Sequence, residues 1–354
     1  DAFKDSAPAE LVDCVGHDDL MVLMFTSGTT GRSKAVMLSE RNFFTTVECQ
    51  VKFGDAMLDY KHEHMPEDKN DVLSNFAILP LFHLGTFICL FVWACKGWAL
   101  NLSADIRDFY RDLGLMHSDA IAVAPMLMEA IYKDVKRGRR ARLNGVWNPC
   151  GSSAMFDGAM LAELAQQGMM ITQVYGMTET CGDGIINYEQ DEKHIRAVGK
   201  PDDHAEYKLD ETGEICIRGG CVMLGYYKDP EATAEVLDAD GWFHTGDLAR
   251  VDEDGFYYIT GRKKNIIILD NGENVSPEEL ENLLSKCEAV KECIVREKGK
   301  KICAVVYCGE ADQQTVRDFI TETNRTLPLY KRMSAVEFST EPLPRTGTGK
   351  LLRK

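Results

Sequence analysis

The first stretch whose residue types could do chemistry is a loop rich in glycine and hydroxyl groups. It consists of Thr26, Ser27, Gly28, Thr29, Thr30, Gly31, Arg32, Ser33 and Lys34. Glycine permits positive φ and close approach of the backbone, so N–H groups and hydroxyls can surround a phosphate while the two cations add charge. The spacing matches neither GxxxxGKS/T nor GxGxxG. Taken alone, the loop is either a phosphate-binding loop, the interpretation we favour, or an ordinary polar turn.

Four later motifs place further polar side chains among glycines. They are YGMTET at 175–180, HTGD at 244–247, GRKKN at 261–265 and PRTGTGK at 344–350. With the loop, and in this order, they resemble the motifs of the acyl- and aryl-adenylate-forming family, from about residue 20 to the end of the chain. The resemblance implies that ATP and Mg²⁺ activate a carboxylic acid as its adenylate, with release of pyrophosphate, before CoA takes up the acyl group.

The resemblance also implies which residues surround the nucleotide. Tyr175 offers a face to adenine, Thr178 a hydroxyl to the α-phosphate and Glu179 a carboxylate to Mg²⁺. Further nucleotide contacts fall on the loop from Thr26 to Lys34, on Gly176, and on the small residues Gly151, Ser152 and Ser153. The plainer alternatives are a half-buried aromatic at a strand end for Tyr175 and a solvated glutamate for Glu179.

Two charged residues in later motifs complete the predicted nucleotide site. Asp247 is suited to accept both ribose hydroxyls, because a carboxylate can take two hydrogen bonds at once, and Arg262 helps to hold the nucleotide. A third, Lys350, matches the family's catalytic lysine, which bridges the acyl carboxylate and the α-phosphate. The alternative for Lys350 is an exposed lysine in a glycine-rich tail.

The remaining matches concern the second half-reaction and the acid. Lys264 matches the hinge about which the family's small C-terminal domain turns between two poses. The hairpin residues Gly272, Glu273 and Asn274 match the segment that serves thioester formation, and so imply contact with CoA. His83 lies where the family gates the acyl pocket. Because histidine cannot replace the aspartate that holds an amino acid's ammonium group, a fatty or other apolar acid is favoured.

Composition limits the classes of protein and partner. The 354 residues are 45% hydrophobic and 27% charged, which is typical of a soluble globular protein of two or three domains. The net charge of −16 argues against nucleic acid or an anionic membrane as the main partner. The apolar run 84–95 is too short for a transmembrane segment. We therefore expect a soluble protein.

The cysteines indicate the redox compartment. All 12 are scattered singly, with no CxxC, and His62 and His64 lack further ligands nearby. No zinc site is predicted from such spacing. Free thiols in a reducing cytoplasm are the expected state, so we predict a cytoplasmic location.

The order of apolar and amphipathic segments predicts the fold. Residues 1–187 alternate between strand and helix patterns, which predicts an α/β core with a doubly wound, mainly parallel sheet. Residues 188–261 contain short strands with glycine-rich turns and predict a small β subdomain, and residues 262–354 predict a mobile α+β C-terminal domain. Ligands bind beyond the carboxyl ends of parallel strands, where both TSGTTG and YGMTET are expected. The apolar run 21–24 before the phosphate loop predicts another buried parallel strand.

Two features depart from the family pattern. The phosphate loop ends Arg-Ser-Lys-Ala where the family has Pro-Lys-Gly, and only 24 residues precede Phe25, where the family has a substantial N-terminal segment. We therefore expect the strands at 21–25 and 72–79 to leave apolar surface uncovered. Such surface favours a homodimer or a complementing N-terminal segment.

The sequence thus predicts an ATP-dependent carboxylic acid–CoA ligase. One alternative is a ligase that passes the acyl group to the phosphopantetheine of a carrier protein. The other is a truncated, non-catalytic nucleotide-binding protein. The short N-terminal segment favours the latter, whereas Lys350, Glu179 and Asp247 oppose it.

Overall fold

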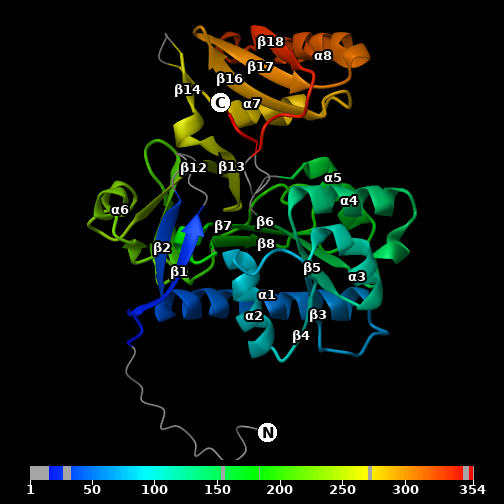
Figure 1. The fold of residues 1–354 in the computed structure, drawn as a ribbon, viewed down its shortest axis with the longest axis vertical. Coiled ribbons are helices and arrows are strands. Elements are labelled where there is room, and N and C mark those ends of the chain that lie inside the picture. The colour runs from blue at the N-terminus through cyan, green and yellow to red at the C-terminus, as the bar shows by residue number, and fades with distance from the viewer. Residues whose placement is uncertain are drawn as a thin grey trace, which may run out of the picture.

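The computed structural model describes residues 16–26, 33–152, 156–182, 184–269, 273–345 and 351–353. Its largest sheet has six strands in the order β4-β3-β5-β6-β7-β8 (Figure 1). These are β3 (Ser74–Ala77), β4 (Ala99–Leu102), β5 (Ala120–Val123), β6 (Asn148–Ser152), β7 (Thr172–Gly176) and β8 (Gly184–Asn187). Neighbouring strands are parallel except β7 and β8, which are antiparallel. The predicted mainly parallel sheet is confirmed.

Helices cover both faces of this sheet. One face packs against α1 (Glu40–His64) and α2 (Leu84–Cys95), and the other against α3 (Phe109–Leu115), α4 (Pro125–Lys136) and α5 (Gly158–Gln166). The short 3₁₀ helices η1 (Ile106–Asp108) and η2 (Arg140–Leu143) precede α3 and follow α4. The chain runs from β3 to β4 in one direction and then back past β3 to β5. Right-handed crossovers therefore place α2 and α3 on opposite faces, so the sheet is doubly wound.

The strand before the phosphate loop lies outside this sheet. β1 (Leu20–Thr26) pairs antiparallel with β2 (Lys34–Ser39), which pairs antiparallel with β11 (Gly225–Tyr226). The prediction of a buried parallel strand is wrong, because an apolar run reports burial of some side chains and not the direction of the partner strand. Met24 is buried, whereas Phe25 is 69% exposed.

The two strands that were expected to leave apolar surface uncovered differ in the exposure of their apolar side chains. In β3 the side chain of Phe76 is fully buried between the two helical layers, so that half of the prediction is wrong. In β1 the side chains of Leu20, Met21 and Phe25 are exposed, as expected. Of the two segments, therefore, β1 leaves several apolar side chains uncovered, whereas in 72–79 Val72 is exposed and Leu73, Phe76 and Ile78 are buried.

A second, antiparallel sheet follows the parallel one in the chain. Its strand order is β13-β12-β10-β9. The strands are β9 (Ala205–Leu209), β10 (Glu214–Gly219), β12 (Phe243–Val251) and β13 (Tyr257–Arg262), and α6 (Pro230–Val236) lies between β11 and β12. The change to short antiparallel strands after residue 187 is as predicted.

The C-terminal part of the chain has a hydrophobic cluster of its own. It contains β16 (Glu292–Lys298), β17 (Lys301–Tyr307), β18 (Ala335–Ser339), α7 (Pro277–Leu284) and α8 (Gln313–Thr326), with the hairpin β14 (Ile267–Ile268) and β15 (Asn274–Val275). The 3₁₀ helices η4 (Lys263–Asn265), η5 (Glu310–Asp312) and η6 (Leu329–Lys331) connect these elements. Figure 1 shows this unit above the larger part of the molecule, with β13 leading into it.

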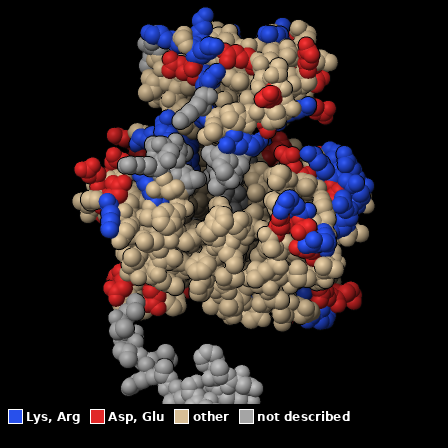
Figure 2. Space-filling model, in the orientation of Figure 1, with Lys and Arg blue, Asp and Glu red and all other residues tan. Residues whose placement is uncertain are grey.

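Charge is distributed unevenly over the surface. Figure 2 shows Lys and Arg gathered on the side that carries α4, although the net charge is −16. The exposed cations of α4 and η2 are Lys133, Lys136, Arg137, Arg139, Arg140 and Arg142. The net charge therefore does not describe this face. Among the helices that the structure describes, none has both the length and the apolar content needed to cross a membrane.

Candidate active site

Most of the predicted site residues meet at one edge of the parallel sheet. His83 follows β3, Gly151 and Ser152 end β6, and Tyr175 and Gly176 end β7. Because β3, β6 and β7 are parallel, their carboxyl ends share an edge, and ligands of doubly wound sheets bind there, at the point where strand order reverses. Gly151 also needs to be glycine, because a Cβ would lie 2.4 Å from the ring of Phe156.

The antiparallel sheet brings Asp247 and Arg262 to the end of β7. The two residues are register partners on β12 and β13. Arg262 Nε lies 2.7 Å from Asp247 Oδ1, and Arg262 Nη2 donates to Oδ2 at 3.3 Å. The hydroxyl of Tyr175 donates to the same Oδ2 at 3.1 Å. Two motifs that are 72 residues apart thus share one hydrogen bond.

Asp247 is buried and Tyr175 is partly buried, and burial affects the protonation state of Tyr175. Asp247 is 3% exposed, and a buried carboxylate needs a cation or donors, which Arg262 and Tyr175 supply. Burial, and then the charge of Asp247, raise the pKa of Tyr175 well above its usual value. Tyr175 therefore remains a neutral donor at physiological pH. Its ring and the Asp247 carboxylate are therefore held together at the carboxyl edge of the parallel sheet.

The turn before Asp247 is fixed by a second buried carboxylate. Glu214 accepts from the backbone N–H of Gly246 at 2.7 Å and from Lys263 Nζ at 2.6 Å. Gly246 has φ +73°, which favours glycine at this position of HTGD. A cavity of about 330 Å³ opens beside this turn and is lined by Thr245, Gly246, Arg262, Lys263 and Lys264. The predicted hinge residue Lys264 thus borders the candidate site.

Tyr226 is a site residue that the sequence analysis missed. Its hydroxyl donates to Glu179 Oε1 at 2.8 Å, and Lys34 Nζ lies 4.4 Å from the centre of its ring. Glu179 stands on the 3₁₀ helix η3 (Thr178–Thr180), directly after β7. Tyr226 is on β11, beside β2, whose first residue is Lys34. It therefore connects the end of the phosphate loop to the predicted magnesium ligand, and no spacing in the sequence indicated this.

The electrostatic setting of Tyr226 is similar to that of Tyr175. Burial first, and then the charge of Glu179, raise the pKa of Tyr226 well above its usual value. Tyr226 therefore stays protonated and keeps donating to the carboxylate. Glu179 is consequently oriented, which argues against the alternative of a freely solvated glutamate.

The other predicted residues are less closely gathered. His83 is exposed and stacks on Phe82, with 6.0 Å between ring centres. Glu273 and Asn274 belong to the β14–β15 hairpin, where Glu273 accepts a backbone hydrogen bond from Leu269 at 3.0 Å. Thr26 donates its hydroxyl to the carbonyl of Lys34 at 3.5 Å. The predicted residues outside the described part of the chain are Ser27, Gly28, Thr29, Thr30, Gly31, Ser153, Gly272 and Lys350.

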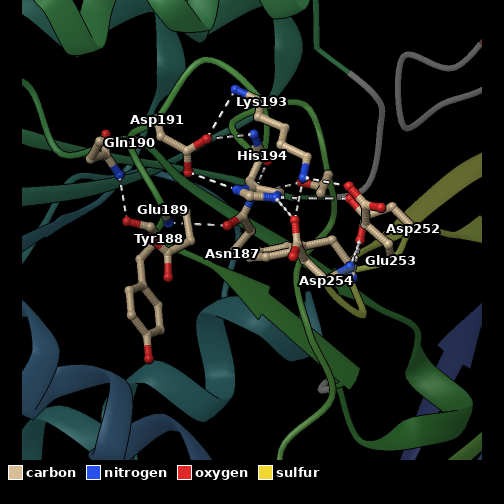
Figure 3. A network of polar contacts seen from close by, with 12 residues as sticks. Asn187, Tyr188, Glu189, Gln190, Asp191, Lys193, His194, Asp252, Glu253 and Asp254 are labelled. Atoms are coloured by element: carbon tan, nitrogen blue, oxygen red, sulfur yellow. Dashed lines mark hydrogen bonds and ion pairs between the residues drawn. The ribbon is translucent and has the colours of Figure 1, made fainter.

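A network of hydrogen bonds around His194 connects the strands that carry the site residues. Figure 3 shows His194 between Asp191, at 2.9 Å from Nδ1, and Asp254, at 3.1 Å from Nε2. Gln173 on β7 donates to the carbonyl of Ile195, at 2.6 Å, and to that of Ala197. Asp254 lies in the turn between β12 and β13. The segment around His194 therefore joins the strand that carries Tyr175 to the strands that carry Asp247 and Arg262.

Comparison with protein families shows which family the chain belongs to. The model of the AMP-binding enzyme family matches residues 2–227, and that of the AMP-binding enzyme C-terminal domain matches residues 279–350. The chain belongs to the AMP-binding enzyme family. The resemblance stated from the five motifs is thereby confirmed. Family membership also agrees with the mixed α/β fold and its parallel sheet.

Relatives of this AMP-binding enzyme are named as CoA ligases and synthetases. The chain is 29% identical to 4-coumarate–CoA ligase 3 of Oryza sativa subsp. japonica, over 99% of the chain and 66% of that protein. It is 32% identical to feruloyl-CoA synthase of Amycolatopsis sp, over 99% and 71%. It is 30% identical to the long-chain-fatty-acid–CoA ligase of Salmonella typhimurium, over 95% and 61%. The chain therefore spans about two thirds of the length of these relatives, and their acids differ.

Solved structures give the same result. The o-succinylbenzoate CoA synthetase of Bacillus subtilis, in complex with its acyl-adenylate intermediate, superposes with a TM-score of 0.77 at 25% identity, over 96% of this chain and 69% of that one. The same enzyme with ATP and a magnesium ion also has a TM-score of 0.77, over 99% and 72%. These neighbours are adenylate-forming enzymes, which confirms the fold class.

Proposed function

We propose that this chain carries the catalytic machinery of an ATP-dependent carboxylic acid–CoA ligase that works through an acyl-adenylate. The observation that supports it most strongly is the group Tyr175, Asp247 and Arg262, joined by contacts of 2.7–3.3 Å at the carboxyl edge of the parallel sheet. An aromatic face, a buried carboxylate and a guanidinium at one edge suit adenine, ribose and phosphate, respectively.

The first half-reaction joins the acid to the α-phosphate and releases pyrophosphate. In the proposed arrangement Asp247 accepts the ribose hydroxyls, Tyr175 lies beside adenine with Gly151 and Gly176, and Thr178 donates to the α-phosphate. Glu179, oriented by Tyr226, is an oxygen ligand of the kind that Mg²⁺ prefers. Bound Mg²⁺ would neutralise charge on the phosphates. Lys34 and the loop before it hold the β- and γ-phosphates, and Lys350 bridges the acid and the α-phosphate.

The second half-reaction transfers the acyl group to a thiol. We propose the domain division 1–187, 188–261 and 262–354, with Lys264 as the hinge. Rotation about it would exchange the Lys350 segment for the hairpin that contains Gly272, Glu273 and Asn274. Lys264 borders the cavity beside Asp247, a suitable place for a pivot. The attack of the CoA thiol on the adenylate carbonyl forms the thioester and releases AMP.

For the acid, we propose an apolar or aromatic carboxylic acid. His83 lies at the carboxyl end of β3, next to the point where strand order reverses, with the exposed ring of Phe82 against it. Neither side chain offers an anion to an ammonium group. Relatives named for coumarate, ferulate and long-chain fatty acids are consistent with an apolar acid of unspecified length.

The test is carboxylate-dependent release of pyrophosphate from ATP and Mg²⁺, over a panel of aromatic, short-chain and long-chain acids. We expect turnover with one class of acid, abolished by Lys350→Ala and retained by Lys301→Ala, which removes an exposed lysine of β17. CoA and a carrier protein are then compared as acceptors of the acyl group. A folded protein that binds ATP without releasing pyrophosphate for any acid would contradict the proposal.

A further inference from the structure

Three metal-ligating side chains from distant parts of the sequence converge away from the candidate active site. Cys49 lies on α1, and Asp202 and His204 lie just before β9. Their donor atoms Sγ, carboxylate O and ring N are all within 4.8 Å of one another. Cys49 Sγ is 3.2 Å from Asp202 Oδ2, and His204 Nδ1 contacts Asp202 Oδ1. Cys49 is 6% exposed and the His204 side chain 5%, so two of the three donors are buried.

The ring of His204 is held on both sides. Its Nε2 lies 3.1 Å from the hydroxyl of Tyr207, which also donates to the carbonyl oxygen of Gly184. Its Nδ1 faces Asp202, and the other oxygen of that carboxylate accepts from the thiol of Cys49. The three donor atoms therefore gather at one place between α1 and the start of β9.

We propose that Cys49, Asp202 and His204 form a binding site for a divalent transition-metal ion, with Zn²⁺ as the best fit. Thiolate sulfur, imidazole nitrogen and carboxylate oxygen are the usual ligands of Zn²⁺, which takes four ligands in a tetrahedron. Three protein ligands leave one position for water. Mg²⁺ and Ca²⁺ prefer oxygen ligands alone, so this site is chemically distinct from the one proposed at Glu179.

Two other His-containing clusters in the described residues are less suitable. Lys193 Nζ contacts Asp254 in the cluster of His194, Asp252 and Asp254. Lys263 Nζ lies 3.7 Å from Asp210 in the cluster of Asp210, Cys216 and His244. A lysine thus already supplies a cation in each.

The lysine beside the Cys49 cluster is directed elsewhere. Lys52 Nζ pairs with Asp203 at 2.6 Å, and Asp203 is not one of the three ligands. The ammonium group of Lys52 is thus paired with a carboxylate outside the cluster. The contacts of Asp202 within the cluster are a thiol and an imidazole, which are ligands for a metal ion.

A metal at this site would have a structural consequence. Cys49 lies on α1, in a helical layer of the parallel sheet, whereas Asp202 and His204 lead into β9 of the antiparallel sheet. Cys49 and Asp202 are 153 residues apart in the sequence. The ion would therefore cross-link the two sheets that bring Tyr175 and Asp247 together. Binding would also release the thiol proton of Cys49, because the thiolate is the ligand.

The experiment measures metal binding by the purified chain, independently of catalysis. The protein is stripped with a chelator and dialysed against Zn²⁺, and bound zinc is measured by elemental analysis. Co²⁺ is then used as a spectroscopic probe of thiolate ligation. The test variants are Cys49→Ser and His204→Gln. The matched controls are Cys95→Ser and His62→Gln, which replace an exposed cysteine and an exposed histidine.

We expect about one Zn²⁺ per chain in the wild type and in both controls, and loss of that ion in both test variants. Co²⁺ should give a thiolate-to-metal charge-transfer band that Cys49→Ser removes. Zinc should also raise the melting temperature of the wild type and of both controls, but not of the test variants, since a ligand of the native state stabilises it. If Cys49→Ser does not fold, His204→Gln carries the comparison. Wild-type protein that binds no zinc, or binds as much as the folded test variants, would overturn the proposal.

Discussion

Asp247 and Arg262 face each other across β12 and β13, with Arg262 Nε 2.7 Å from Asp247 Oδ1. Both residues belong to one hairpin, so the turn between its strands determines the register that places them opposite each other. Because Tyr175 of the parallel sheet donates to the same carboxylate, Asp247 is one of the points where the two sheets share a polar contact. Changes at Asp247 should therefore affect both the contact between the sheets and the proposed nucleotide site.

The first prediction concerns this carboxylate. Asp247→Asn keeps the shape of the side chain but replaces a charged acceptor by a neutral one. We expect affinity for ATP to fall about 10- to 100-fold, since hydrogen bonds to charged groups contribute about 1.5–3 kcal/mol. Calorimetric titration with ATP measures this. Asp318→Asn, at an exposed position of α8, is the control. An unchanged affinity in folded Asp247→Asn would exclude Asp247 from the nucleotide site.

The second prediction concerns Tyr226. Tyr226→Phe removes the hydroxyl that donates to Glu179 but keeps the ring over which Lys34 lies. The loss of one hydrogen bond should lower the free energy of unfolding by about 0.5–1.5 kcal/mol. If Glu179 binds Mg²⁺, the Mg²⁺ concentration needed for half-maximal pyrophosphate release should rise, while Tyr227→Phe, at an exposed tyrosine, leaves it unchanged. An identical Mg²⁺ dependence in both variants would show that Tyr226 does not orient a metal ligand.

The third prediction concerns close packing at the end of β6. In Gly151→Ala, the new Cβ would lie 2.4 Å from the ring of Phe156, so the ring or the strand must shift. Overpacking of this kind costs about 1–3 kcal/mol. Thermal unfolding with and without AMP measures both the loss of stability and any loss of AMP affinity. Gly114→Ala has no atom within 4 Å of its Cβ and serves as the control. Equal melting temperatures for the two variants would contradict the prediction.

The parallel sheet could be predicted from the sequence because the apolar residues of its strands and helices recur at the spacing typical of each element. Pro125 begins α4, and the residues of YGMTET follow β7 at the sheet edge. The direction of β1 could not be predicted, since an apolar run is compatible with a parallel or an antiparallel partner. β1 pairs with β2, the strand on the other side of the phosphate loop. The periodicity of apolar residues does not predict such a pairing.

The parts of the site that the sequence did not reveal depend on contacts between distant segments. Tyr226 reaches Glu179 only because β11 adds to the edge of β2. The cluster of Cys49, Asp202 and His204 joins residues whose spacing matches no metal-binding motif. A search for CxxC or neighbouring histidines therefore predicted no zinc site. Such sites become visible only when the tertiary structure brings the donors together.

The last prediction concerns the pH dependence of stability. The hydrogen bond to Asp191, followed by that to Asp254, raises the pKa of His194 above its usual value, because both ring nitrogens donate to carboxylates only when the ring is charged. A raised pKa in the folded state means that His194 stabilises the fold fully below its unfolded pKa of about 6.5. This contribution is lost as pH rises through the folded value. We expect the wild type to lose stability as pH rises above about 6.5, measured by urea unfolding at a series of pH values. His194→Asn should lose less over the same range, whereas His62→Asn, at an exposed histidine paired with Asp71, should behave as the wild type does. A pH dependence that is equally steep in His194→Asn would show that other groups cause it, and that the network behind β7 does not depend on the charge of this ring.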